Sequence, residues 1–118
     1  RAEDIMMMFA DDGVDAIWCM RGGYGSSRIV PYFKDFKFEN YPKPFIGYSD
    51  VTYLHLFFNQ SHQLMTYHGP MIKDLLLNDE LTTCHCLETI MGETTFDIID
   101  VPYYNETLRP VSGTLVEI

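Results

Sequence analysis

The chain has 118 residues, of which 47% are hydrophobic and 14% aromatic, and its formal net charge is −9. This length allows one domain with a buried core, and the composition is that of a globular rather than a disordered protein. The excess of 17 acidic over 8 basic residues would repel a polyanion, which argues against nucleic acid as a partner, and the apolar stretches are too short to span a bilayer.

The first third of the chain predicts a helix, a strand and a second helix. Apolar residues at helical spacing indicate a helix over residues 2–11, with Gly13 as its C-terminal cap. The chain begins with Arg1 and not Met, directly at the start of this helix, so we expect the chain to be a piece of a longer protein. The apolar run 15–20 is typical of a strand buried on both faces, and a glycine-rich turn then leads into a helix over 26–33.

The middle of the chain continues the same alternation. A polar and aromatic connector over 36–43 precedes a strand over 44–48 and a broadly apolar helix over 51–60. A further strand over 64–67 closes at a Gly-Pro pair. These elements predict two successive strand–helix–strand units.

The last third predicts one helix and two more strands. Asn78 is the predicted N-cap of a helix that runs to Met91 and is ended by Gly92. Strands are expected over 96–99 and 111–116. The whole order predicts an α/β fold, with a mainly parallel sheet and helices on both faces.

A possible nucleophile follows the strand over 44–48. An apolar run ends in Gly47-Tyr48-Ser49-Asp50 and a helix starts at once, which is the layout of a nucleophile elbow, although Val51 stands where a second glycine is usual. Such a turn raises the serine hydroxyl above the sheet. The same residues also suit a simple helix start, with Ser49 as N-cap and Asp50 in the first turn, and the tetrapeptide alone leaves that alternative open.

The glycine-rich turn could complete such a site. Attack by serine creates an oxyanion that needs fixed donors, and the amide of Asp50 together with an amide near Gly22 and Gly23 would suffice. Active sites of parallel sheets gather at the carboxyl ends of strands, where both segments lie. The turn also has an ordinary structural interpretation, and it lacks the order of nucleotide-binding glycine loops.

No histidine in the sequence makes a convincing base for Ser49. His68 follows a strand and could line the crevice, whereas the others fall on helices or in a polar turn, namely His55, His62 and His85. The stretch Cys84-His85-Cys86 has no second ligand group at zinc spacing, so we expect no metal site. The odd cysteine count indicates reduced thiols and a cytoplasmic setting.

Three segments, in this order, resemble the LD-carboxypeptidase family of serine peptidases. They are Arg21-Gly22-Gly23-Tyr24-Gly25, residues 42–52 with the Gly-Tyr-Ser-Asp motif, and Tyr67-His68-Gly69-Pro70-Met71. The resemblance covers residues 1–72 well and the remainder loosely. The family includes the muramoyl-tetrapeptide carboxypeptidases and the microcin self-immunity proteins.

The resemblance implies specific roles for residues in these segments. It makes Ser49 the nucleophile, the amides of Gly23 and Asp50 the oxyanion donors, and Arg21, Gly22 and His68 candidates for the substrate pocket. It also implies a flavodoxin-like N-terminal domain, of which residues 1–118 would be a part. The family's catalytic glutamate and histidine come from a C-terminal domain whose motifs do not occur here, and Glu117 does not match that glutamate.

The function implied by the resemblance is hydrolysis of the L–D peptide bond that releases a terminal D-amino acid from murein tetrapeptides. It implies no metal or other cofactor, a small peptide substrate, a cytoplasmic homodimer, and no activity for this chain by itself. Two alternatives remain open: an immunity peptidase that cleaves a peptidyl-nucleotide, and a non-catalytic α/β binding module in which Ser49 only caps a helix.

Overall fold

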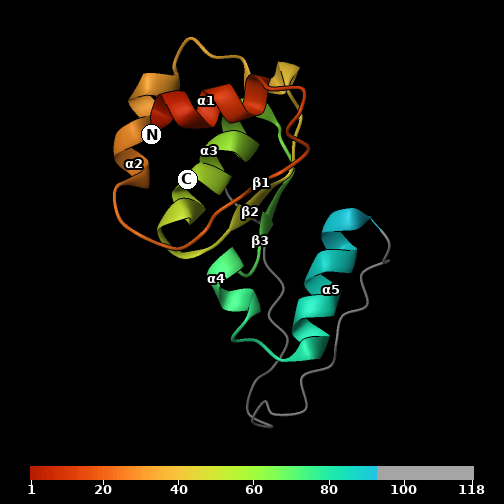
Figure 1. Cartoon of the computed structure of the whole chain (residues 1–118). Coiled ribbons are helices and arrows are strands. Elements are labelled where there is room, and N and C mark those ends of the chain that lie inside the picture. Colours follow the sequence, from red (N-terminus) through yellow and green to blue (C-terminus); the bar gives the residue numbers. More distant parts are fainter. Residues whose placement is uncertain (93–118) are drawn as a thin grey trace, which may run out of the picture.

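The computed structural model describes residues 1–92, which form an α/β unit around three parallel strands (Figure 1). The strands lie in the order β1 (Ile17–Trp18), β2 (Phe45–Gly47) and β3 (Thr66–His68). Phe45 pairs with Ile17 on one side and with Thr66 on the other. The predicted α/β class with a parallel sheet is confirmed, and the strands expected over 96–99 and 111–116 lie outside the described residues.

Helices lie on both sides of this sheet (Figure 1). One side carries α1 (Ala2–Ala10), α2 (Ser26–Ile29) and α3 (Thr52–His62), and the other side carries α5 (Glu80–Met91). A short helix that the sequence did not predict, α4 (Ile72–Leu75), follows β3. Three 3₁₀ turns complete the described elements: Val30–Phe33, Phe38–Asn40 and Ser49–Val51.

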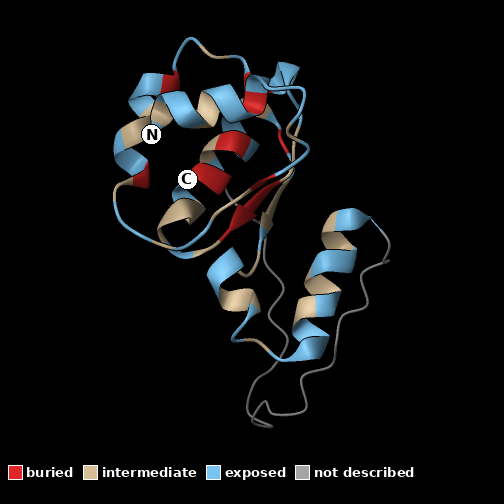
Figure 2. Ribbon diagram, in the orientation of Figure 1, coloured by how far each residue is buried: buried red, intermediate tan, exposed pale blue. Residues whose placement is uncertain are grey.

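The core between the sheet and the first three helices consists mainly of phenylalanine. Phe38 makes edge-to-face contacts with Phe9 and Phe33, at ring centroid distances of 4.9 and 5.1 Å. Phe58 of α3 packs on Phe45 of β2 at 5.1 Å. All five rings are fully or almost fully buried, so α3 is fixed directly against the strand that leads to Ser49 (Figure 2).

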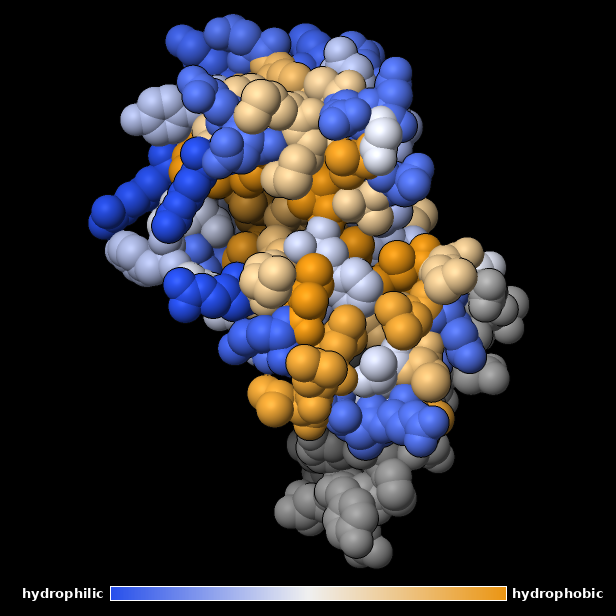
Figure 3. Space-filling model, viewed as in Figure 1, coloured by the Kyte–Doolittle hydropathy of each residue, from blue (hydrophilic) through white to orange (hydrophobic). Residues whose placement is uncertain are grey.

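The far side of the sheet is packed less tightly. Helix α5 contributes no buried residue (Figure 2). Apolar surface gathers over α4 and the turn after it (Figure 3), where Leu76 and Leu77 are 91% and 81% exposed. Among residues 1–92, no helix has the length and apolar character needed to cross a membrane.

The end of α1 differs from the prediction. The C-cap is Asp11 in an extended conformation, so the expected cap at Gly13 is wrong. The Asp11 carboxylate accepts a hydrogen bond from the Gly13 amide at 2.8 Å, and the Lys43 amine donates to the carbonyls of Met8 and Asp11. A lysine from another segment thus satisfies the last carbonyls of the helix, a role that glycine would otherwise serve.

Two further boundaries differ for local reasons. The helix predicted over 26–33 changes to a 3₁₀ turn after Ile29, because Pro31 has no amide proton to continue α-helical bonding. The N-cap of α5 is Asp79 and not Asn78, since the Asp79 carboxylate accepts from the amide of Thr82 at 2.9 Å.

Candidate functional site

Ser49 lies at the turn between β2 and α3 with a left-handed backbone, φ 63°. Its side chain is exposed at the carboxyl end of the sheet. Helix α3 has Val51 as its N-cap, and neither α3 nor the 3₁₀ turn before it has a side-chain cap. The alternative in which Ser49 caps the helix is therefore wrong. A left-handed serine at the end of a strand is a sparsely populated conformation that the surrounding structure must hold in place.

Close packing at Gly47 holds this turn. A Cβ atom at Gly47 would lie 2.8 Å from Cγ2 of Val51 and 3.1 Å from Cβ of Cys19, distances that real Cβ atoms do not tolerate without movement of the neighbours. The absence of a side chain at position 47 therefore lets the first turn after β2 fold back against β1.

His55 fixes the same turn from within α3. Only 6% of His55 is exposed. Its Nε2 lies 2.9 Å from the carbonyl oxygen of Gly47. The same oxygen also accepts a hydrogen bond from the Gly69 amide at 3.1 Å. A carbonyl can only accept, so Nε2 is the donor of this bond, and in the neutral ring Nδ1 is the unprotonated nitrogen. Burial lowers the pKa of His55, although the bond to Gly47 opposes this. This histidine supports the strand end and does not reach Ser49.

The glycine-rich turn after β1 approaches Ser49 at Gly22. A Cβ atom at Gly22 would lie 3.6 Å from Oγ of Ser49 and 3.7 Å from Cε of the fully buried Met71. Gly25 has φ 103° and serves as the N-cap of α2. The turn thus passes beside the serine and then enters a helix through a conformation that favours glycine.

Three other predicted site residues, Arg21, Gly23 and His68, are exposed. A Cβ atom at Gly23 would meet nothing within 4 Å. His68 lies at the end of β3, with its ring 5.9 Å from that of His55 and 6.4 Å from that of Tyr48. Of the predicted turn residues, Gly22 is the one that the structure brings beside the Ser49 hydroxyl.

Two side chains near the site, those of Asp50 and Trp18, make hydrogen bonds that join separate segments of the chain. The Asp50 carboxylate accepts a hydrogen bond from the Ser26 amide at 2.9 Å. The Trp18 indole donates to the carbonyl of Pro70 at 2.7 Å and so ties β1 to the segment after β3. The sequence carries no signal for the bond between Asp50 and Ser26, because the two residues are 24 positions apart. Only the position of Asp50 next to Ser49 could have drawn attention to its side chain.

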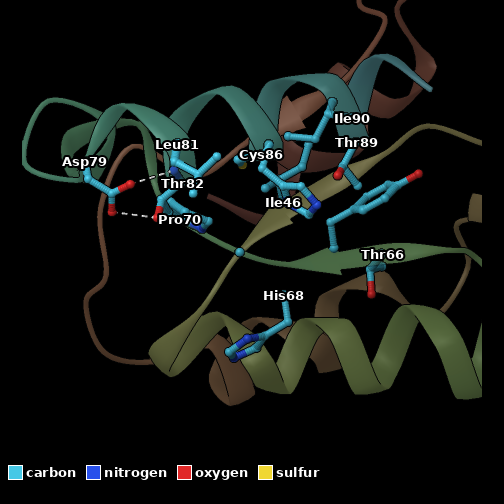
Figure 4. A pocket seen from close by; sticks show the side chains of 13 residues that line it. Ile46, Thr66, His68, Pro70, Asp79, Leu81, Thr82, Cys86, Thr89 and Ile90 are labelled. Atoms are coloured by element: carbon cyan, nitrogen blue, oxygen red, sulfur yellow. Dashed lines mark hydrogen bonds between the residues drawn. The ribbon is translucent and has the colours of Figure 1, made fainter. Parts of the chain in front are cut away.

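No histidine of residues 1–92 hydrogen-bonds to Ser49. His62 pairs with Glu39 at 2.5 Å, and hydrogen bonds lower the pKa of that carboxyl. His85 lies on α5 and lines a cavity of about 660 Å³ between that helix and the sheet (Figure 4). In Figure 4 the side chain of His68 points toward α3, away from α5. Ser49 is not part of this cavity.

A smaller hollow of about 400 Å³ lies beside the turn. It is lined by residues at or after the carboxyl ends of β2 and β3, including Tyr48, His68, Asp74 and Asn78. A larger cavity of about 860 Å³ lies under the glycine turn, where residues 20–26 meet α1 and α3. The residues on either side of Ser49 thus line open space, Tyr48 the smaller hollow and Asp50 and Val51 the larger cavity.

The fold and the turn at Ser49 define an α/β protein with an exposed serine at the carboxyl end of a parallel sheet. Residues 1–69 match the family model described as the LD-carboxypeptidase N-terminal domain, and the chain belongs to that family. This agrees with the resemblance found in the sequence.

Individual relatives are consistent with this assignment. The chain is 37% identical over 114 residues to a probable murein peptide carboxypeptidase of Bacillus subtilis. The aligned residues cover 95% of the chain and 34% of that protein. It is 35% identical over 79 residues to the murein tetrapeptide carboxypeptidase of Pseudomonas aeruginosa, covering 66% of the chain and 25% of that protein. The chain thus spans about a third or less of these curated relatives.

A solved structure shares the fold. The crystal structure of an MccF-like protein from Bacillus anthracis str. Ames superimposes with a TM-score of 0.70 at 33% sequence identity. The match covers 76% of the present chain and 28% of that protein.

Proposed function

We propose that this chain is the nucleophile-bearing part of a serine LD-carboxypeptidase that releases a terminal D-amino acid from murein tetrapeptides. The observation that carries the proposal is Ser49, exposed at φ 63° beside the glycine turn. The names of the Bacillus subtilis and Pseudomonas aeruginosa relatives support the substrate class.

In this mechanism a base takes the proton of the Ser49 hydroxyl while Oγ attacks the scissile carbonyl. The amides of Asp50 and Gly23 hold the oxyanion, with Gly22 close by. The C–N bond then breaks, the proton passes to the amine of the leaving D-amino acid, and water hydrolyses the ester on Ser49. In this proposal Arg21 and His68 contact the peptide.

In this mechanism the base and its orienting carboxylate lie outside residues 1–118. We propose that residues 1–118 are part of an N-terminal domain, that a C-terminal domain supplies a glutamate and a histidine, and that this chain alone is inactive. The whole protein would act without a metal, as a cytoplasmic homodimer.

The test compares variants of the full-length protein that contains this chain. Release of D-alanine from a murein tetrapeptide should fall by about a thousand-fold or more in Ser49→Ala, because the bond-forming atom is lost. Ser61→Ala is the matched control, since Ser61 is an exposed serine at the far end of α3, and it should keep normal turnover. Equal release by wild type and Ser49→Ala would remove Ser49 from the mechanism.

A second candidate is an immunity peptidase that cleaves a peptidyl-nucleotide. The likeness to the MccF-like protein favours it. Both candidates use the same serine, so the substrate distinguishes them. Turnover of a peptidyl-nucleotide, with none of the murein tetrapeptide, would select the second.

A further inference from the structure

The glycine turn is held at both of its ends by segments from elsewhere in the chain. At its start, the amides of Ile72 and Lys73 donate to the carbonyls of Cys19 and Met20, each at 3.1 Å. These bonds join the beginning of α4 to the end of β1. The first end of the turn is thus fixed by the main chain alone.

The second end is held by a side chain. Oδ2 of Asp50 accepts from the Ser26 amide at 2.9 Å, and Ser26 is 8% exposed. Hydrogen bonds from the amide and hydroxyl of Ser26, and from the amide of Gly25, lower the pKa of Asp50, so the carboxyl is ionised near neutral pH. Bonds from amides to a carboxylate are among the stronger hydrogen bonds in proteins.

We propose that the Asp50 carboxylate is a positioning residue that holds the glycine turn at the correct height beside the Ser49 hydroxyl. The inference rests on the function proposed above. In that mechanism the amide of Asp50 is one oxyanion donor and the glycine turn provides the other. One residue therefore supplies the first donor with its main chain and fixes the second with its side chain.

The geometry makes this role sensitive to small movements. A Cβ atom added at Gly22 would lie in ordinary van der Waals contact with Ser49. Among residues 1–92, the main chain between Met20 and Ser26 is hydrogen-bonded to other segments only near its two ends. A misplacement of about 1 Å in an active site can cost a hundred-fold in rate. Because the oxyanion forms only on the way to the transition state, the loss should fall on kcat and leave KM nearly unchanged.

The experiment uses the full-length protein and three substitutions. Asp50→Ala removes both acceptor oxygens, while Asp50→Asn keeps one and has the same shape. Asp11→Ala is the matched control, because the Asp11 carboxylate also accepts a main-chain amide, that of Gly13, but lies before β1 at the opposite end of the sheet. Steady-state kinetics on the murein tetrapeptide are measured well below the thermal midpoint of each variant.

We expect kcat to fall about 10- to 100-fold in Asp50→Ala with KM changed less than about three-fold, and Asp50→Asn to recover part of the loss. Asp11→Ala should keep wild-type kcat. If Asp50→Ala does not fold, Asp50→Asn still decides, since a kcat equal to wild type would overturn the inference. A normal kcat for Asp50→Ala, or a change in KM alone, would also overturn it.

The two proposals fail in different ways. Full activity of Ser49→Ala removes the proposed function and this inference together. Loss of activity in Ser49→Ala with a normal kcat in both Asp50 variants removes only the positioning role.

Discussion

Two non-glycine residues among residues 1–92 have a positive φ, Ser49 at 63° and Gln63 at 54°, and their surroundings differ. Gln63 follows the last turn of α3, where its amide donates to the carbonyls of Asn59 and Phe58. That is an ordinary helix end, in which the left-handed residue satisfies carbonyls that the helix leaves free. Ser49 stands before a helix and caps nothing.

The positive φ of Gln63 is explained by hydrogen bonds within its own helix, whereas the positive φ of Ser49 is not. At Gln63 the hydrogen bonds of the helix end account for the conformation. At Ser49 the conformation is imposed by packing at Gly47 and by the His55 bond to the Gly47 carbonyl. Strain that the neighbouring structure imposes, with an exposed hydroxyl as its result, is typical of functional sites.

The largest expected effect comes from filling the space at Gly47. Gly47→Ala should lower the free energy of unfolding by about 1–3 kcal/mol, because its Cβ would overlap Val51 and Cys19. Gly22→Ala is the comparison, because the added Cβ would make only ordinary contacts. This substitution should change the free energy of unfolding by less than about 0.5 kcal/mol, but it should lower activity because the added methyl group lies beside the Ser49 hydroxyl. Urea denaturation of both variants of the full-length protein checks this. Equal free energies of unfolding for Gly47→Ala and Gly22→Ala would show that the turn at Ser49 does not depend on close packing at Gly47.

A smaller effect is expected from the pH dependence of His55. An unfolded histidine titrates near 6.5, and burial lowers the pKa in the folded state. Below pH 6.5 the unfolded chain therefore takes up a proton that the folded chain resists, so stability should be full above that pH and fall as the pH drops toward the folded value. Thermal unfolding between pH 7 and 5 measures this slope.

The control for that measurement is His55→Gln, which keeps a donor for the Gly47 carbonyl but does not titrate. Its stability should fall less steeply than that of the wild type between pH 6.5 and 5. Parallel slopes for the two proteins would exclude His55 as the titrating group.

The smallest effect tests the comparison itself. Gln63→Gly should raise the free energy of unfolding by about 0.5–1 kcal/mol with no change in activity, since glycine adopts positive φ freely. Ser49→Gly relieves the same strain and should raise stability by a similar amount, but it removes the hydroxyl, so turnover should be lost. Denaturant melts and tetrapeptide assays on both variants would report this. A loss of activity in Gln63→Gly would show that the two turns are not independent.

Much of the architecture could be predicted from the sequence because it depends on local patterns. Apolar runs next to glycine turns placed β1 and β2, and helical spacing placed α1 and α3. The contacts missed were those made by residues distant in sequence, such as Lys43 on the end of α1 and Trp18 on Pro70. No periodicity encodes such contacts, since each depends on how the elements pack.

The candidate site divides in the same way. The position of Ser49 at a strand end followed from its tetrapeptide, and the glycine turn was predicted at the same edge of the sheet because it also follows a strand. The bond from Ser26 to Asp50 could not be predicted, because it requires the two turns to be placed in space first. The helix that Asn78 was expected to cap is capped one residue later, where the Asp79 carboxylate has the better geometry.

The central claim is that the Ser49 hydroxyl is a nucleophile, and labelling with a serine-directed phosphonate tests it most directly. The full-length protein is treated with the reagent, digested and analysed by mass spectrometry, with Ser49→Ala in parallel. We expect one adduct on the peptide that contains Ser49 and none in the variant. No adduct on the active wild-type protein, or an adduct on another serine that Ser49→Ala retains, would contradict the claim.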